Sequence, residues 1–165
     1  MSAVKVLFVC LGNICRSPTA HAVFQQLVSA GGLDDQIAVD SAGTGDWHVG
    51  LPPDRRASAS AALRGYDLSG LRARQVGPAD FVEYDYILAM DEQNLRNLRQ
   101  LAPKDFRGEL QLFLHYAGDR QQREVPDPYY GGQDGFDQVL DLVEEASRGL
   151  LQALVQRHGL QARPR

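Results

Sequence analysis

Residues 6–18 read Val-Leu-Phe-Val-Cys-Leu-Gly-Asn-Ile-Cys-Arg-Ser-Pro, and this stretch decides the fold. A mostly apolar run from Val4 to Val9 is typical of a strand that is buried on both faces of a parallel sheet. The Ser-Pro pair predicts a helix start, with Ser17 as the N-cap and Pro18 at the first helical position, where its missing N–H costs nothing. We therefore expect a strand, a tight loop and a helix in direct succession.

The rest of the chain repeats the alternation of strands and helices. We expect strands at 4–9, 37–42, 86–90 and 110–114, helices at 17–30, 54–64, 91–101 and 136–158, and a long loop at 117–135. Such alternation predicts a single-domain α/β fold, a four-stranded parallel sheet with helices on both faces, in a flavodoxin-like or Rossmann-like three-layer sandwich. We assign residues 1–160 to this domain and 161–165 to a loose C-terminal tail.

Composition excludes several classes of protein. A length of 165 residues suits one domain, and a net charge of −4 argues against a general nucleic-acid or membrane-surface binder. The sequence shows neither a signal peptide nor an apolar stretch long enough for membrane insertion, so we expect a cytoplasmic protein. Two cysteines do not form a structural disulfide framework, and each needs its own explanation.

Cys10 and Arg16 are the first candidate catalytic pair. A thiolate is a strong nucleophile, and a helix N-terminus beside a cation favours its formation. The planar guanidinium of Arg16 can hold two phosphate oxygens at once. Attack of the Cys10 thiolate on a phosphate ester would give a cysteinyl-phosphate, which water then hydrolyses.

The loop between these two residues is suited to enclosing a phosphate. Gly12 allows a close approach of the backbone, and Asn13 tolerates the positive φ that turns an amide inward. The Ser17 hydroxyl is placed to hydrogen-bond the sulfur of Cys10. The expected phosphate-binding residues are Leu11, Gly12, Asn13, Ile14, Cys15 and Ser17.

Asp127 is the candidate general acid. It lies in the long loop between Pro126 and Pro128, which restrict the local backbone. An Asp-Pro sequence also occurs in ordinary turns, and that alternative stays open. The four histidines show no metal-ligand spacing, and of these we consider only His48 as a contact to substrate. The arginine pairs 55–56 and 72/74 are either a positive rim near the cleft or solvated surface, and we favour solvated surface.

The segment at 9–18 resembles the phosphate loop of the low-molecular-weight protein tyrosine phosphatases. Later segments resemble that family in order and spacing: Asp-Ser-Ala-Gly at 40–43, Asp-Trp at 46–47, Ala-Arg-Gln-Val at 73–76, Met-Asp at 90–91 and Asp-Pro-Tyr-Tyr-Gly at 127–131. The resemblance implies a phosphatase without metal or cofactor, with Cys10 as nucleophile, Arg16 as phosphate ligand and Asp127 as general acid. It also implies a supporting hydrogen-bond network of Asn13, Ser17 and Ser41.

The same resemblance implies a selective cleft. Trp47 and Tyr129 would wall it and favour phosphotyrosine over phosphoserine, because aromatic rings gain area and stacking there. The expected partners are phosphotyrosine-containing proteins and a cognate tyrosine kinase. Tyr129 and Tyr130 would be candidates for phosphorylation, and Cys15 for a reversible disulfide with Cys10 or simple space filling.

One residue departs from the family, and three other functions compete. Leu71 stands where some members have a histidine. A protein arginine phosphatase would use the same loop, but the resemblance associates Ile14 with tyrosine. A thioredoxin-coupled arsenate reductase would need more cysteines after Cys15. A non-catalytic phosphotyrosine-binding module would lack Cys10 or Asp127, and both are present.

Overall fold

The computed structural model describes residues 3–118, 121–129 and 133–162. Tyr130, one of the two tyrosines considered for phosphorylation, and the tail residues 163–165 lie outside this range. Within it, Gln161 is tied to Gln36, whose Nε2 donates to the Gln161 carbonyl at 2.8 Å.

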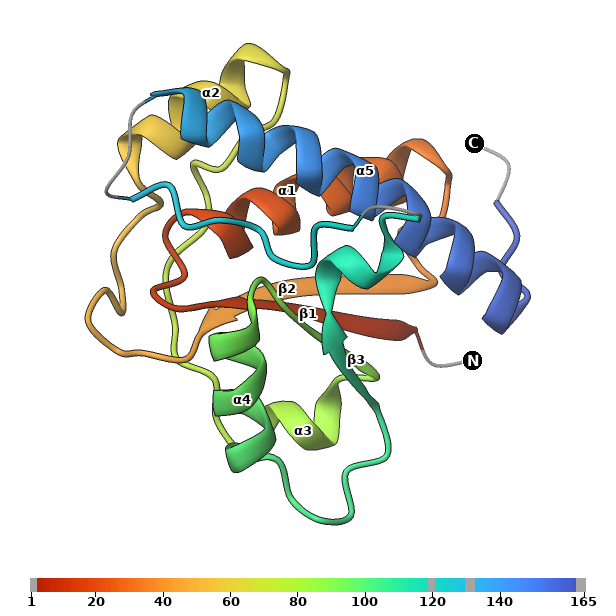
Figure 1. Ribbon diagram of the computed structural model, residues 1–165. Helices are drawn as coiled ribbons and strands as arrows, with labels where there is room; N and C mark the ends of the chain where they lie inside the picture. Colours follow the sequence, from red (N-terminus) through yellow and green to blue (C-terminus); the bar gives the residue numbers. More distant parts are fainter. Residues whose placement is uncertain (1–2, 119–120, 130–132, 163–165) are drawn as a thin grey trace.

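A four-stranded sheet forms the middle layer (Figure 1). Its strands are β1 (Val4–Cys10), β2 (Ile37–Gly43), β3 (Tyr86–Ala89) and β4 (Glu109–Leu112). They are all parallel and lie in the order β2-β1-β3-β4. The predicted parallel sheet is therefore confirmed. Since the strand order reverses at β1, the carboxyl end of β1 is the place where such folds bind ligands.

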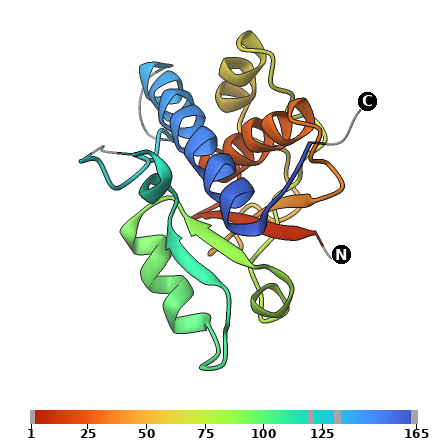
Figure 2. The same cartoon turned by 90° about the vertical axis from the view of Figure 1, so that its right-hand side faces the viewer.

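The long helices pack on one face of this sheet. α1 (Arg16–Ala30) and α5 (Gln133–His158) lie against each other there, and α2 (Arg55–Leu63) packs on both (Figure 2). A short 3₁₀ helix, η1 (Phe113–Tyr116), also contacts α5. The opposite face carries α4 (Glu92–Leu101), and Phe81 of α3 (Asp80–Glu83) joins its apolar cluster.

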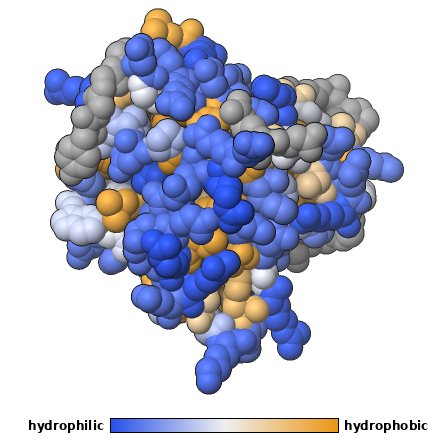
Figure 3. All heavy atoms as spheres, in the orientation of Figure 1, coloured by the Kyte–Doolittle hydropathy of each residue, from blue (hydrophilic) through white to orange (hydrophobic). Residues whose placement is uncertain are grey.

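Alternating side chains of β1 divide between the two faces. Val6 and Phe8 enter the apolar cluster with α1 and α5, whereas Leu7 and Val9 enter the cluster with α4. All four are fully buried, as expected of a strand covered on both sides. In the orientation of Figure 1, the visible surface is mostly hydrophilic, with apolar residues in small separate groups (Figure 3).

The start of α1 corrects one prediction. The helix begins at Arg16, its N-cap is Cys15, and no side chain caps it. Ser17 is thus not the N-cap, and Pro18 is the third helical residue and not the first. The physical reason is a competing partner, because the Ser17 hydroxyl bonds to the side chains of Cys10 and Asn13.

Other differences concern boundaries and short elements. The expected strand at 110–114 is shorter, since residues from Phe113 onward form η1. α5 begins at Gln133, three residues earlier than expected, and α3 was not predicted. None of the helices in the described part of the chain is long and apolar enough to cross a membrane.

Candidate active site

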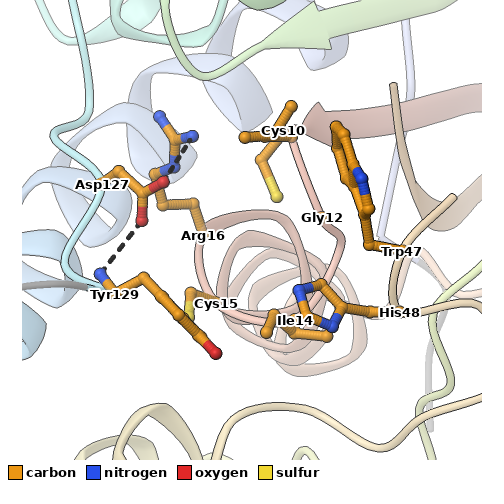
Figure 4. A pocket seen from close by; sticks show the side chains of 10 residues that line it. Cys10, Gly12, Ile14, Cys15, Arg16, Trp47, His48, Asp127 and Tyr129 are labelled. Atoms are coloured by element: carbon orange, nitrogen blue, oxygen red, sulfur yellow. Dashed lines mark hydrogen bonds and ion pairs between the residues drawn. The ribbon is translucent and has the colours of Figure 1, made fainter. Parts of the chain in front are cut away.

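A cavity of about 380 Å³ opens at the carboxyl end of β1 (Figure 4). It collects residues from three separate parts of the sequence, 10–16, 47–48 and 127–129. Its lining consists of Cys10, Leu11, Gly12, Ile14, Cys15, Arg16, Trp47, His48, Asp127 and Tyr129. Three predicted site residues, Asn13, Ser17 and Ser41, are buried and are not part of this lining.

The Cys10 sulfur points into the cavity (Figure 4). Cys10 is the last residue of β1, and it is almost fully buried. Its Sγ lies 3.1 Å from Ser17 Oγ, and the backbone N–H of Asn13 donates to it at 3.3 Å. The Ser17 hydroxyl and the Asn13 N–H therefore hold the sulfur in place. The predicted contact between Ser17 and Cys10 is confirmed.

Asn13 connects the loop to the rest of the site. Its φ of 58° confirms the predicted left-handed conformation. Its Nδ2 donates to Ser17 Oγ at 2.8 Å, and its Oδ1 accepts from the backbone N–H of Arg74 at 3.0 Å. The loop that holds Cys10 is thereby tied to the segment at 73–76.

The end of β2 approaches this loop very closely. The Thr44 and Gly45 amides donate to the carbonyls of Cys10 and Leu11, both at 2.9 Å. A Cβ on Gly43 would lie 2.8 Å from the Leu11 carbonyl oxygen. Only glycine fits there without displacing backbone atoms of the loop.

Arg16 is buried, and acceptors surround its guanidinium. Its Nη1 donates to Asp91 Oδ2 at 2.6 Å and to the Val125 carbonyl at 2.9 Å, and its Nη2 lies 3.6 Å from Asp127 Oδ2. Burial alone would lower the pKa of Arg16, but Cys10, Asp91 and Asp127 raise it above its ordinary value. The group is therefore a permanent cation at the base of the pocket.

Asp127 is held at the mouth of the pocket. Its Oδ1 accepts from the backbone N–H of Tyr129 at 3.0 Å, while Oδ2 faces Arg16. Its side chain remains 37% exposed, so it has access both to solvent and to a molecule in the pocket. The structure thus brings it to Cys10 and Arg16, more than 100 positions away in sequence.

Aromatic side chains form the walls. Trp47 and Tyr129 lie on opposite sides of the pocket, and the ring of His48 is 6.1 Å from that of Tyr129 (Figure 4). Trp47 is 68% exposed and packs against Gly45, where an added Cβ would overlap its ring. The only tryptophan is therefore in the pocket and not in the core.

Cys15 lines the pocket and also belongs to a small apolar cluster. The cluster contains Ile14, Cys15, Ala57, Ala73 and Phe136, with Tyr129 packed against it. Burial, together with the charge of Asp54, raises the pKa of the Cys15 thiol far above its ordinary value. Cys15 is thus held as a neutral thiol, and both cysteines are free.

Ser41 contacts a residue that the sequence did not single out. His21 of α1 places its Nδ1 3.1 Å from Ser41 Oγ, whereas Leu71, where some members of the resembling family have a histidine, packs on the apolar core. The adjacent Ala42 carbonyl accepts from Ser17 Oγ at 3.4 Å. This end of β2 therefore reaches the Cys10 loop through its backbone.

The family model for low molecular weight phosphotyrosine protein phosphatases matches residues 5–160. The chain belongs to this family. The phosphatase is 46% identical over 156 residues to a low molecular weight protein-tyrosine-phosphatase of Streptomyces coelicolor, covering 91% of this chain and 93% of that one.

Two solved structures show the same fold. YfkJ from Bacillus subtilis superimposes with a TM-score of 0.90 at 39% identity, covering 97% of this chain and 99% of that one. DARP, a Drosophila arginine phosphatase, does so with a TM-score of 0.86 at 36% identity, covering 91% and 97%. The expected family, enzyme class and fold are confirmed.

Sequence reasoning gave no role to several residues of the phosphatase. Asp91 follows the buried strand β3 at its carboxyl end, which is a usable signal for a site residue. The Val125 carbonyl has no such signal, because any residue supplies a backbone oxygen. Arg56 and Arg74, for which we favoured solvated surface over a positive rim near the cleft, are partly exposed but have defined partners. Arg74 pairs with Asp40 and Asp80, and Arg56 bonds to the Tyr129 carbonyl.

Among the described residues, no three His, Cys, Asp or Glu side chains are grouped so that they could hold a metal ion. The pocket gathers the thiols of Cys10 and Cys15, one guanidinium and one carboxyl, between aromatic walls. Groups of these types can act as a nucleophile, an anion ligand and a proton donor.

Proposed function

We propose that this phosphatase hydrolyses phosphotyrosine monoesters of proteins through a cysteinyl-phosphate intermediate. One observation carries the proposal. The Cys10 sulfur, the Arg16 guanidinium and the Asp127 carboxyl line one pocket whose walls are aromatic. The other contacts of the site explain how each group would act.

The phosphate would bind in the loop at 11–16. Because Arg16 Nη1 is committed to Asp91 and Val125, the Nε–Nη2 edge of the guanidinium is the fork offered to the phosphate oxygens. Backbone amides of the loop and of the uncapped start of α1 supply further donors. Charge on the equatorial oxygens would thus meet fixed donors during transfer.

In the first chemical step, the Cys10 thiolate attacks phosphorus. The S–P bond forms as the bond between phosphorus and the tyrosine oxygen breaks, and Asp127 gives its proton to the departing oxygen. In the second step, the Asp127 carboxylate takes a proton from water, whose oxygen attacks phosphorus. The S–P bond breaks, which releases inorganic phosphate and restores the thiolate.

The walls would select the substrate. An aryl ester places its ring between Trp47 and Tyr129, where stacking adds about 0.5–1.5 kcal/mol to the burial of apolar area. A serine ester has no ring to fill this space. The proposed partners are phosphotyrosine-containing proteins and the kinase that modifies them, in the cytoplasm, where free cysteines such as Cys10 and Cys15 persist.

A second candidate substrate is phosphoarginine. The solved Drosophila arginine phosphatase shares this fold at 36% identity, so the fold alone does not choose between the two. Ile14, which lines the pocket, favours tyrosine because an apolar side chain leaves a guanidinium without a hydrogen-bond partner. An Ile14→Thr variant should therefore lower the ratio of phosphotyrosine to phosphoarginine turnover.

The test is phosphate release from matched peptides carrying phosphotyrosine, phosphoarginine or phosphoserine. We expect release mainly from phosphotyrosine, with Cys10→Ser inactive but still able to bind that peptide. Preference for phosphoarginine would replace the substrate and retain the thiol chemistry. Binding of phosphotyrosine without release by the parent protein would instead identify a binding module.

A further inference from the structure

Arg56 lies outside the pocket lining but touches the segment that carries Asp127. We propose that Arg56 is a positioning residue, which holds Tyr129 and, through it, the Asp127 carboxyl in the orientation needed for proton transfer. This assignment rests on the proposed function, because it concerns the same reaction.

Hydrogen bonds connect the backbone at Arg56 to the Cys10 loop. The backbone N–H of Asp54 donates to the Ile14 carbonyl at 2.8 Å, which joins the beginning of α2 to that loop. The Asp54 carboxylate caps α2 by accepting from the amides of Arg56, at 2.8 Å, and Ala57, at 3.3 Å. The backbone of Arg56 is therefore connected to the loop by hydrogen bonds through Asp54.

The guanidinium of Arg56 then reaches across to the opposite wall. Its Nη2 donates to the Tyr129 carbonyl at 2.7 Å and lies 3.3 Å from Asp54 Oδ2. The same group is 5.6 Å from the centre of the Tyr129 ring and 4.8 Å from that of Phe136. A planar cation with several donors can satisfy a carbonyl, a carboxylate and two rings together, whereas a lysine cannot.

Tyr129 connects Arg56 to the Asp127 carboxyl. Its backbone N–H donates to Asp127 Oδ1 at 3.0 Å, while its carbonyl is held by Arg56. The second Asp127 oxygen is 3.6 Å from Arg16 Nη2. The carboxyl is thus held between two arginines, Arg16 directly and Arg56 through one residue, although only Arg16 lines the pocket.

The consequence differs from a general loss of stability. If Arg56 orients Asp127, its removal should harm the reaction only where the leaving group needs a proton. An aryl phosphate with a poor leaving group depends on the acid, and one with a good leaving group does not. The effect should also vanish when Asp127 can no longer donate a proton.

The experiment measures kcat/KM of the parent and of Arg56→Ala on phenyl phosphate and p-nitrophenyl phosphate, in the parent and in the Asp127→Asn background. Arg56→Met keeps an apolar side chain packed on Phe136 but removes the hydrogen-bond donors. Thermal denaturation of both Arg56 variants shows whether either has lost its fold. Arg55→Ala, the exposed neighbour on the same helix, is the matched control and should behave like the parent.

We expect Arg56→Ala and Arg56→Met to lose about 10-fold or more on phenyl phosphate and less than about 3-fold on p-nitrophenyl phosphate, with no further loss in Asp127→Asn. Equal losses on the two esters, or the same loss with and without Asp127, would overturn the positioning role. Absence of turnover of either ester by the parent would instead defeat the proposed function, and this assignment with it.

Discussion

Asp91 serves Arg16 and α4 at the same time. Its Oδ2 accepts from Arg16 Nη1 at 2.6 Å, and its Oδ1 accepts from the Asn94 amide at 2.8 Å as the N-cap of the helix. One carboxylate at the end of β3 thus links a helix start to the cation at the base of the pocket. The two roles can be separated by mutation.

Asp91→Asn should weaken phosphate binding without unfolding the protein. An asparagine oxygen can still cap α4, but its NH₂ would then face the Arg16 donors, and a buried pair would be lost. We expect the inhibition constant of inorganic phosphate to rise about 10-fold, on the basis of roughly 1.4 kcal/mol for one such bond. Asp91→Ala should in addition lose about 1 kcal/mol of stability. Unchanged phosphate inhibition in Asp91→Asn would contradict this.

Ser17→Ala should slow catalysis through the sulfur. The Ser17 hydroxyl lies 3.1 Å from Cys10 Sγ and accepts from Asn13 Nδ2. Its loss leaves the sulfur with only the Asn13 backbone N–H and takes away the hydroxyl acceptor of Asn13 Nδ2. We expect kcat to fall by about 10- to 100-fold, in line with the removal of one donor from a charge-stabilising site. The measurement is steady-state hydrolysis of p-nitrophenyl phosphate, and a parent-like kcat would exclude this role.

Trp47→Ala should separate substrate binding from stability. Because the side chain is 68% exposed, its removal should change the free energy of unfolding by less than about 0.5 kcal/mol. The loss of one aromatic wall should raise KM for a phosphotyrosine peptide by about 10-fold. Denaturant melts and steady-state kinetics test both parts, and a KM equal to that of the parent would remove Trp47 from the substrate wall.

Alkylation of the Cys15 thiol should require a higher pH than alkylation of an ordinary cysteine. A raised pKa means that the thiolate, the form that is alkylated, appears only at a higher pH than for an ordinary thiol. In Cys10→Ser, iodoacetamide should therefore modify Cys15 slowly at neutral pH and faster as the solution becomes alkaline. Asp54→Asn removes a nearby negative charge and should move this rise to lower pH. Mass spectrometry measures the extent, and an ordinary pH profile would contradict the prediction.

Phe8→Ala should be the most damaging of these changes to stability. Its ring makes edge-to-face contacts with Phe24 and Phe113, at centroid distances of 5.6 and 4.9 Å. Truncation of a fully buried phenylalanine costs about 3–5 kcal/mol. Leu63→Ala, at a side chain that is 86% exposed, is the control and should change the free energy of unfolding by less than about 0.5 kcal/mol. Equal effects in denaturant melts would refute this account of the core.

The loop that begins at Cys10 shows how far sequence reasoning reaches. The buried strand, the loop and the helix were all readable in one stretch, and so was the positive φ of Asn13. The cap of α1 was not, because Ser17 is a good N-cap by type and only the nearby Cys10 sulfur and Asn13 amide give it another partner. At this position the N-cap preference of serine is outweighed by tertiary contacts with Cys10 and Asn13.

The same limit applies to the arginines. Arg56 and Arg74 are ordinary surface residues by their sequence surroundings, yet one holds the Tyr129 carbonyl and the other pairs with Asp40 and Asp80. Their partners lie 73, 34 and 6 positions away. Neither the periodicity nor the composition of the sequence indicates which side chains meet in this way, and two of the three contacts are long-range.

The sequence by itself determined the order of the candidate reactive groups along the chain: a thiol after a buried strand, an arginine six positions later, and an aspartate between prolines. These follow from side-chain type and local spacing, which the covalent chain fixes. Only the tertiary structure decided that Asp91 and Val125 hold Arg16, and that Arg56 reaches the loop of Asp127. The reason is that parallel strands bring their carboxyl ends to one edge, so the loops that meet there come from distant parts of the sequence.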